Sequence, residues 1–152
     1  MTNNLLFDKL VSYYQSIAWQ MVRVPNETII STTYQGKNSS WVFVATSDEP
    51  RGIIVLFARY PETCSAEKYS VVSEFLERAN FGMTHGAWVM DRHDGEIRYR
   101  VGVDMENMKL TNEYIQSLTT YTNMTMEYYL PGIQAILSKN FSPQQAWQMI
   151  FA

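Results

Sequence analysis

The sequence predicts an α+β fold in which helices cover an antiparallel sheet of five strands, in the order α-β-β-β-α-β-β-α. Apolar residues recur at helical spacing near the N-terminus and again in the second half of the chain. Between these helical stretches, β-branched and aromatic runs alternate with short turns. A chain of 152 residues, of which 46% are hydrophobic, has the size of one compact unit, so we expect residues 1–152 to form a single domain.

The N-terminal part predicts one helix followed by three strands. From Leu5 to Trp19 the apolar residues share one face of a helix, with polar residues between them. After Pro25 the period changes to two, and turn residues separate three short runs. Short turns between strands indicate an antiparallel meander, with strands at 28–34, 40–46 and 53–60.

The second half predicts a helix, a hairpin and further helices. Ser65 begins a helix that runs to Asn80 and that Gly82 ends. Asp94-Gly95 is a strong tight-turn signal between strands at 87–91 and 96–104. A long helix begins at Thr111, and we expect Pro131-Gly132 to break or kink it. A short final helix follows the capping box at 142–145.

The strands of the meander are apolar on both faces, unlike strand 96–104, which alternates apolar and charged residues. Such strands need cover on both sides, from the protein's own helices, a second copy of the chain, or a partner protein. We expect the uncovered face to carry Val42, Val44, Ile54 and Leu56, or to be its opposite. The candidate interaction surface is therefore Trp41, Val42, Phe43, Val44, Ile54 and Leu56.

Charge and hydropathy argue against two classes of partner. Twelve basic and fifteen acidic side chains give a net charge of -3, which disfavours the phosphate attraction behind most nucleic-acid binding. No window is apolar enough for a membrane helix, and the segment 1–10 lacks the features of a secretory signal. We therefore expect a cytoplasmic protein that binds neither nucleic acid nor membrane.

Groups able to carry chemistry are scarce. His85, Asp91, His93, Asp94 and Glu96 lie in or near the hairpin turn, where the turn itself and solvation account for them. We therefore predict no catalytic residue, no metal site and no cofactor, and a protein that is not an enzyme.

Three other features leave alternatives open. Cys64 precedes a helix but has no histidine near it in sequence, which favours a buried or incidental thiol over a reactive one. Arg98 and Arg100 project from one strand face as a candidate anion contact, or simply form a solvated face. A Tyr and Met stripe on the long helix is typical of a core, although adaptable binding surfaces also use these residues: Tyr114, Tyr121, Met124, Tyr128 and Tyr129.

Several segments resemble the YbjN family, which shares the fold of type III secretion chaperones. The resemblance rests on residues 74–83, on Asp94 to Arg100, on Met126 to Ile133, and on the closing Ser142 to Ala146. Members of this family are small bacterial proteins described as sensory transduction regulators, with no established catalytic residues. Secretion chaperones with this fold are typically homodimers that hold an extended segment of a client, so the resemblance implies a homodimer and a protein or peptide client.

The expected function is thus a non-enzymatic protein-interaction module, chaperone-like or regulatory, that binds a protein segment as a homodimer. The alternative is a sensor that binds a small ligand in a pocket between the sheet and the long C-terminal helix, with Arg98 or Arg100 near its mouth.

Overall fold

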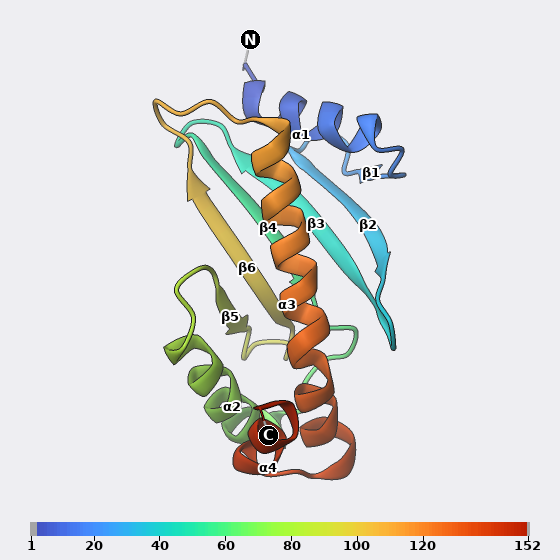
Figure 1. Ribbon diagram of the computed structural model, residues 1–152, viewed down its shortest axis with the longest axis vertical. Helices are drawn as coiled ribbons and strands as arrows, with labels where there is room; N and C mark the ends of the chain where they lie inside the picture. Colours follow the sequence, from blue (N-terminus) through green and yellow to red (C-terminus); the bar gives the residue numbers. More distant parts are fainter. Residues whose placement is uncertain (1–2, 152) are drawn as a thin grey trace.

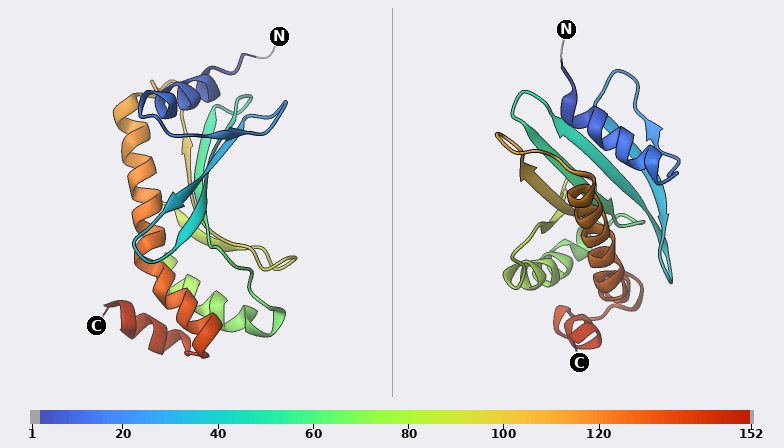
Figure 2. Two further views of the ribbon diagram at one scale, coloured as in Figure 1. Left: turned by 90° about the vertical axis from the view of Figure 1, so that its right-hand side faces the viewer. Right: turned by 45° about the horizontal axis from the view of Figure 1, so that its top comes forward.

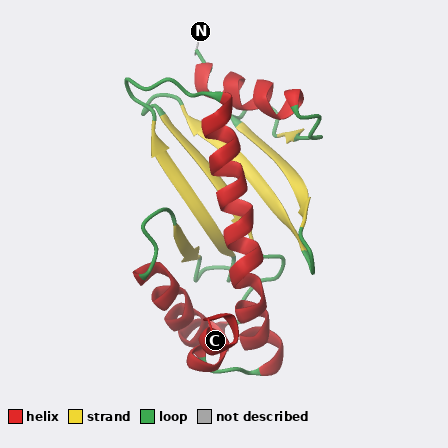
Figure 3. Ribbon diagram, viewed as in Figure 1, coloured by secondary structure: helices red, strands yellow, loops and turns green. Residues whose placement is uncertain are grey.

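The computed structural model describes residues 3–151 and shows a long helix lying across one face of an antiparallel sheet (Figures 1 and 3). Residues 1, 2 and 152 of the predicted single domain lie outside the described range. The elements are α1 (Leu5–Ser16), β1 (Val22–Arg23), β2 (Ile29–Gln35), β3 (Ser40–Asp48), β4 (Ile53–Arg59), the 3-10 turn Ala66–Lys68, α2 (Tyr69–Phe81), β5 (Ala87–Met90), β6 (Ile97–Asp104), α3 (Asn112–Lys139) and α4 (Pro143–Phe151).

The sheet has six strands in the order β1-β2-β3-β4-β6-β5, and every neighbouring pair is antiparallel. The α+β class and the antiparallel sheet are confirmed, but the prediction of five strands is wrong. The additional strand, β1, has two residues and pairs with Ile30 and Ser31 of β2. Two residues are too few to show a period, so the sequence pattern could not predict this strand.

One helix boundary also needs correction, and the long helix bends without the break that was the other expected outcome. Helix α1 ends at Ser16 rather than Trp19, because Ala18 adopts a left-handed φ of 60° that a helix cannot accommodate. Helix α3 is unbroken through Pro131, which removes only one hydrogen bond of the ladder. The helix changes direction in its C-terminal part (Figure 2, left). A Cβ on Gly132 would lie 2.5 Å from Cδ1 of Ile150, so this glycine allows α4 to pack closely against α3.

Most of the core lies between the sheet and the two helices α1 and α3 (Figure 2, left). It continues between α2, α3 and α4, where Val72, Phe75 and Ala146 are buried. Two buried polar contacts fix the helices in it. Trp41 Nε1 donates to Asn123 Oδ1 over 2.9 Å, and Tyr14 Oη lies 2.7 Å from Thr119 Oγ1. Asn123 Nδ2 in turn donates to the Thr119 carbonyl. These contacts set the position of α3 relative to β3 and α1.

The edge strand β5 is covered by a side chain. The Asn80 amide donates to the Trp88 carbonyl over 2.9 Å and accepts from the Trp88 N–H over 2.7 Å. Asn80 thus supplies the two hydrogen bonds of a neighbouring strand at that residue. Within residues 3–151, no helix is both long and apolar enough to span a bilayer.

We predict that Asn123→Ala lowers the free energy of unfolding by about 2–3 kcal/mol, because the buried Trp41 indole N–H loses its acceptor. Urea unfolding measures this loss. Gln116→Ala, on the exposed side of the same helix, is the control and should change stability by less than about 0.5 kcal/mol. Equal effects of the two variants would contradict the role given to Asn123.

Stability should fall in alkaline solution because three buried tyrosines resist ionisation. Burial raises the pKa of Tyr60 to about 12 and raises the pKa of Tyr14 and of Tyr99 as well. In the unfolded chain tyrosines ionise near pH 10, so this contribution is complete below pH ~10 and is lost as the pH rises further. The free energy of unfolding should drop by about 1 kcal/mol per such tyrosine by pH ~11. Tyr60→Phe should flatten the decline, and an unchanged slope would contradict the assignment.

Candidate functional site

One face of the sheet has no helix over it. The register places Val44 opposite Phe57 and Val55 opposite Gly102, so these residues point away from α1 and α3. Figure 2 (left) shows the helices α1 and α3 on the other side of the sheet. We call this surface the outer sheet face. Its apolar members, several of them half-buried by their neighbours alone, are Ile29, Val42, Val44, Ile53, Val55 and Phe57.

The structure divides the predicted interaction surface between two faces. Val42 and Val44 lie on the outer sheet face as a pair, but Ile54 and Leu56 do not share it. Leu56 pairs with Ala45, and that face lies under α1 and α3, together with Trp41 and Phe43. Placing Ile54 and Leu56 beside Val42 and Val44 was therefore wrong. The register across the 48–52 turn, which the sequence alone does not give, decides which residues share a face.

The outer sheet face is basic at one end. Arg98 and Arg59 are directly opposite one another on β6 and β4, and Arg100 is opposite Phe57. The Arg98 guanidinium lies 4.1 Å from the centre of the Phe57 ring and forms an ion pair with Glu96, as does Arg59. Arg100 is exposed and forms no ion pair within residues 3–151.

The opposite end of the same face is acidic. Asp48 on β3 and Asp104 on β6 flank Ile53, which pairs with both of them. Asp48 forms an exposed ion pair with Arg51 at 3.4 Å, and Asp104 accepts the Glu106 N–H. The charge on this surface therefore changes sign along the strands.

A groove lies beside β2. It has a volume of about 370 Å³, and its lining comprises Trp19, Gln20 and the four strand residues 32–35. Trp19 and Tyr34 contact one another in a T-shaped arrangement, with ring centres 6.0 Å apart. Strand β1 pairs only with Ile30 and Ser31, so the β2 edge beyond Ser31 has no neighbouring strand within residues 3–151.

The Tyr and Met stripe on α3 is largely exposed rather than buried in the core. Met124 is 58% and Tyr128 50% exposed, and Tyr114 and Tyr121 are more than one third exposed, whereas Tyr129 is partly buried. The core side of α3 consists of Ile115, Leu118, Thr122, Met126 and their neighbours. The 28-residue helix α3 has one face toward the core and one toward solvent. The sequence pattern favoured the core face for the Tyr and Met stripe, but most of these side chains lie on the solvent face.

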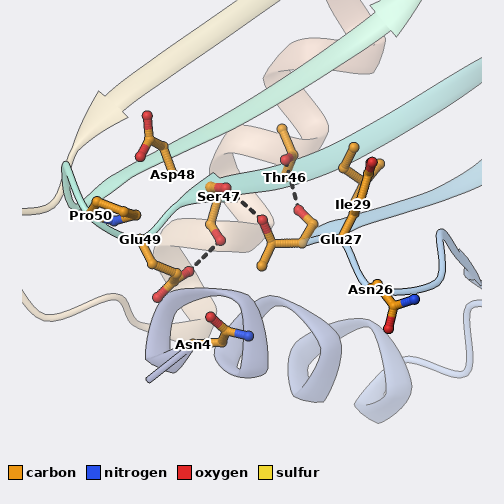
Figure 4. Close-up of a pocket in the computed structure, with 10 residues that line it drawn as sticks. Asn4, Asn26, Glu27, Ile29, Thr46, Ser47, Asp48, Glu49 and Pro50 are labelled. Carbon is orange, nitrogen blue, oxygen red and sulfur yellow. Dashed lines mark hydrogen bonds between the residues drawn. The ribbon is translucent and has the colours of Figure 1, made fainter. Parts of the chain in front are cut away.

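A cavity of about 560 Å³ lies between the start of α1 and the strands β2 and β3 (Figure 4). Its central acidic group, Glu49, is engaged in structure. The Glu49 carboxylate accepts the backbone N–H groups of Leu6 and Phe7, each over 3.1 Å, and the Ser47 hydroxyl. Asn4, which precedes the helix, makes no side-chain cap. Glu49 therefore caps α1 from a distant turn.

The residues considered for chemistry have structural partners. Glu96 pairs with two arginines, Asp91 accepts the His93 N–H, and the His85 ring stacks on Tyr121. No group of three His, Cys, Asp or Glu side chains in the described part of the chain is placed to hold a metal ion. Cys64 is buried, and burial raises the pKa of its thiol while Lys68 lowers it in part. This environment does not favour a thiolate.

A cavity does lie between the sheet and α3, but its lining differs from the one that the sensor hypothesis expects. A cavity of about 250 Å³ lies where the 35–37 turn meets Asn123, Met124 and Glu127 of α3. Arg98 and Arg100 lie on the outer sheet face, across the sheet from this cavity, and so are not at its mouth.

We predict that Glu49→Ala lowers the free energy of unfolding by about 1–2 kcal/mol, because two N–H groups at the start of α1 lose their acceptor. Glu49→Gln keeps an acceptor and loses only the charge, so it should cost about half as much. Glu27→Ala, in the same cavity lining, is the control for thermal and urea unfolding. A Glu49→Ala variant as stable as this control would contradict the capping role.

Comparison with known structures identifies the fold of this chain. No family model matches the sequence, and no curated protein is significantly similar to it. The structure of YbjN from E. coli is similar with a TM-score of 0.63 and 8% identity, over 80% of this chain and 85% of that chain. A chain of the ExsC–ExsE complex gives a TM-score of 0.58 with 12% identity, over 88% and 93%. A chain of the HopA1–SchA chaperone–effector complex gives 0.52 with 12% identity, over 80% and 91%. The fold expected from the resemblance is confirmed: the chain has the fold shared by YbjN and type III secretion chaperones.

Proposed function

We propose that the chain is a non-enzymatic protein-interaction module, chaperone-like or regulatory, that binds an extended protein segment and acts as a homodimer. The observation that carries this proposal is the open edge of β2 beside an aromatic groove. A strand edge with free backbone groups pairs readily with another extended chain.

The hydrogen-bond pattern shows which backbone groups are free. The Gly36 N–H donates to the Ser39 carbonyl over 2.8 Å, and the pairs of an antiparallel ladder alternate from there. Tyr34 and Thr32 therefore bond to β3, whereas the N–H and C=O groups of Thr33 and Gln35 point away from it. These outward groups lie beyond the end of β1 and face the groove.

The groove supplies a place for side chains of an added strand. Trp19 is held by a ring stack on Tyr14, with centres 5.5 Å apart, and it also contacts Tyr34. A rigid aromatic wall next to free backbone groups suits a segment that alternates an apolar side chain with backbone hydrogen bonds. Backbone pairing provides affinity, and the aromatic wall selects the side chain.

The similar structures support a protein as the ligand. One contains a chaperone with its effector, and another is also a complex of two proteins. The homodimer is supported by the outer sheet face, because its apolar side chains are only partly shielded by their neighbours and a second sheet packed on them would complete their burial.

The test is selection from a displayed library of random linear peptides, followed by affinity measurement with two variants. Thr33→Pro removes the outward N–H and leaves the β2–β3 ladder intact, so it should weaken binding of selected peptides by about tenfold. Thr33→Val keeps the N–H and is the matched control, which should bind within about threefold of wild type. Failure to enrich any peptide, or equal binding by both variants, would contradict segment binding at this edge.

A further inference from the structure

We propose that the outer sheet face is the contact between two copies of this chain, packed face to face with their strands antiparallel. This inference rests on the homodimer of the proposed function and assigns its geometry. The contact uses the face of the sheet and leaves the β2 edge free for a segment.

The centre of the face has the character of a packing surface. Val44, Val55 and Phe57 form an apolar strip over the two central strands: Val44 is 7% exposed, Val55 and Phe57 are half-buried, and Arg98 lies over the Phe57 ring. Figure 2 (left) shows no helix on this side of the strip. Two sheets that pack face to face bury such strips against each other in a common core.

The charges select one of the two symmetric arrangements in which the strands of the two copies are aligned. A two-fold axis parallel to the strands would bring the Arg59 and Arg98 end of one copy onto the same end of the other, and the acidic end onto the acidic end. An axis in the interface but perpendicular to the strands reverses the strand direction and sets the basic end against the acidic end. Juxtaposed like charges are strongly unfavourable, so the antiparallel arrangement is the one that the face permits.

The spacing along β6 fits this arrangement. Its outward residues are Arg98, Arg100, Gly102 and Asp104, in that order. When β6 lies antiparallel over its own copy, Arg98 of one chain meets Asp104 of the other, and Arg100 meets Gly102. A Cβ on Gly102 would come no closer than 4.0 Å to its nearest neighbour, Val55 Cγ2, so the space above it is open. The Arg100 guanidinium of one chain therefore fits into the space above Gly102 of the other chain.

The test is sedimentation equilibrium of charge-reversal variants of the full chain. Asp104→Arg places two arginines together, and Arg98→Asp places two aspartates together, so each should raise the dimer Kd at least about tenfold. The double variant restores both pairs and should return to within about threefold of wild type. Arg98 and Asp104 are about 20 Å apart along one strand, so rescue can arise only between chains. Asp104→Asn removes the charge but keeps an oxygen that can accept the Glu106 N–H. This variant therefore measures the effect of losing the charge while the local turn stays intact.

A steric variant tests the same contact without charge. Gly102→Val fits the free chain and favours a strand, so the dimer should be lost while the variant, compared with wild type at a concentration where both are monomeric, unfolds at the wild-type temperature or above. A dimer that tolerates Gly102→Val and both charge reversals would overturn this geometry and leave the homodimer of the proposed function standing. A wild-type chain that stays monomeric when concentrated would overturn both, whereas peptide selection at the β2 edge tests segment binding separately.

Discussion

The packing of α3 across one face of the sheet is the constraint on which the other features depend. It is fixed by a single buried hydrogen bond from Trp41 to Asn123 and by the Tyr14 contact to Thr119, which join the helix to β3 and to α1. Because these groups are buried, a shifted helix would leave them without partners, and that cost holds α3 in one position. The helices α1 and α3 therefore occupy one face, and the other face is left without cover.

Two surfaces of different chemistry follow from that arrangement. The outer sheet face offers side chains, apolar at the centre and opposite in charge at its two ends, and suits another folded surface. The β2 edge offers backbone groups beside Trp19, and suits an extended chain. The second edge of the sheet is blocked at Trp88 by Asn80, so the two edges are not equivalent. Aromatic residues make up 14% of the chain. They lie in the aromatic wall at Trp19 and Tyr34, in the core, and on the exposed side of α3.

Sequence patterns predicted the larger elements because period and turn chemistry are local properties. The strands around Trp41 and Phe57 and the Asp94-Gly95 hairpin follow from such signals. Features that depend on contacts between distant residues were not accessible. The two-residue strand β1 exists only by pairing with β2, and α1 is capped by Glu49 from a remote turn. The face on which Leu56 lies depends on register, and the exposure of Tyr128 depends on which side of α3 meets the sheet. The candidate site was thus only half predictable: Val42 and Val44 were placed in it, but the open β2 edge had no sequence signal.

In the proposed homodimer, a second copy of the chain covers the outer sheet face in solution. The most direct measurement is methyl NMR with a soluble paramagnetic agent, recorded from dilute to concentrated protein. The Val55 methyls should become protected from broadening as the chain associates, while the exposed Met124 methyl on α3 broadens equally throughout. Association that leaves the Val55 methyls as accessible as they are in dilute solution would contradict this arrangement.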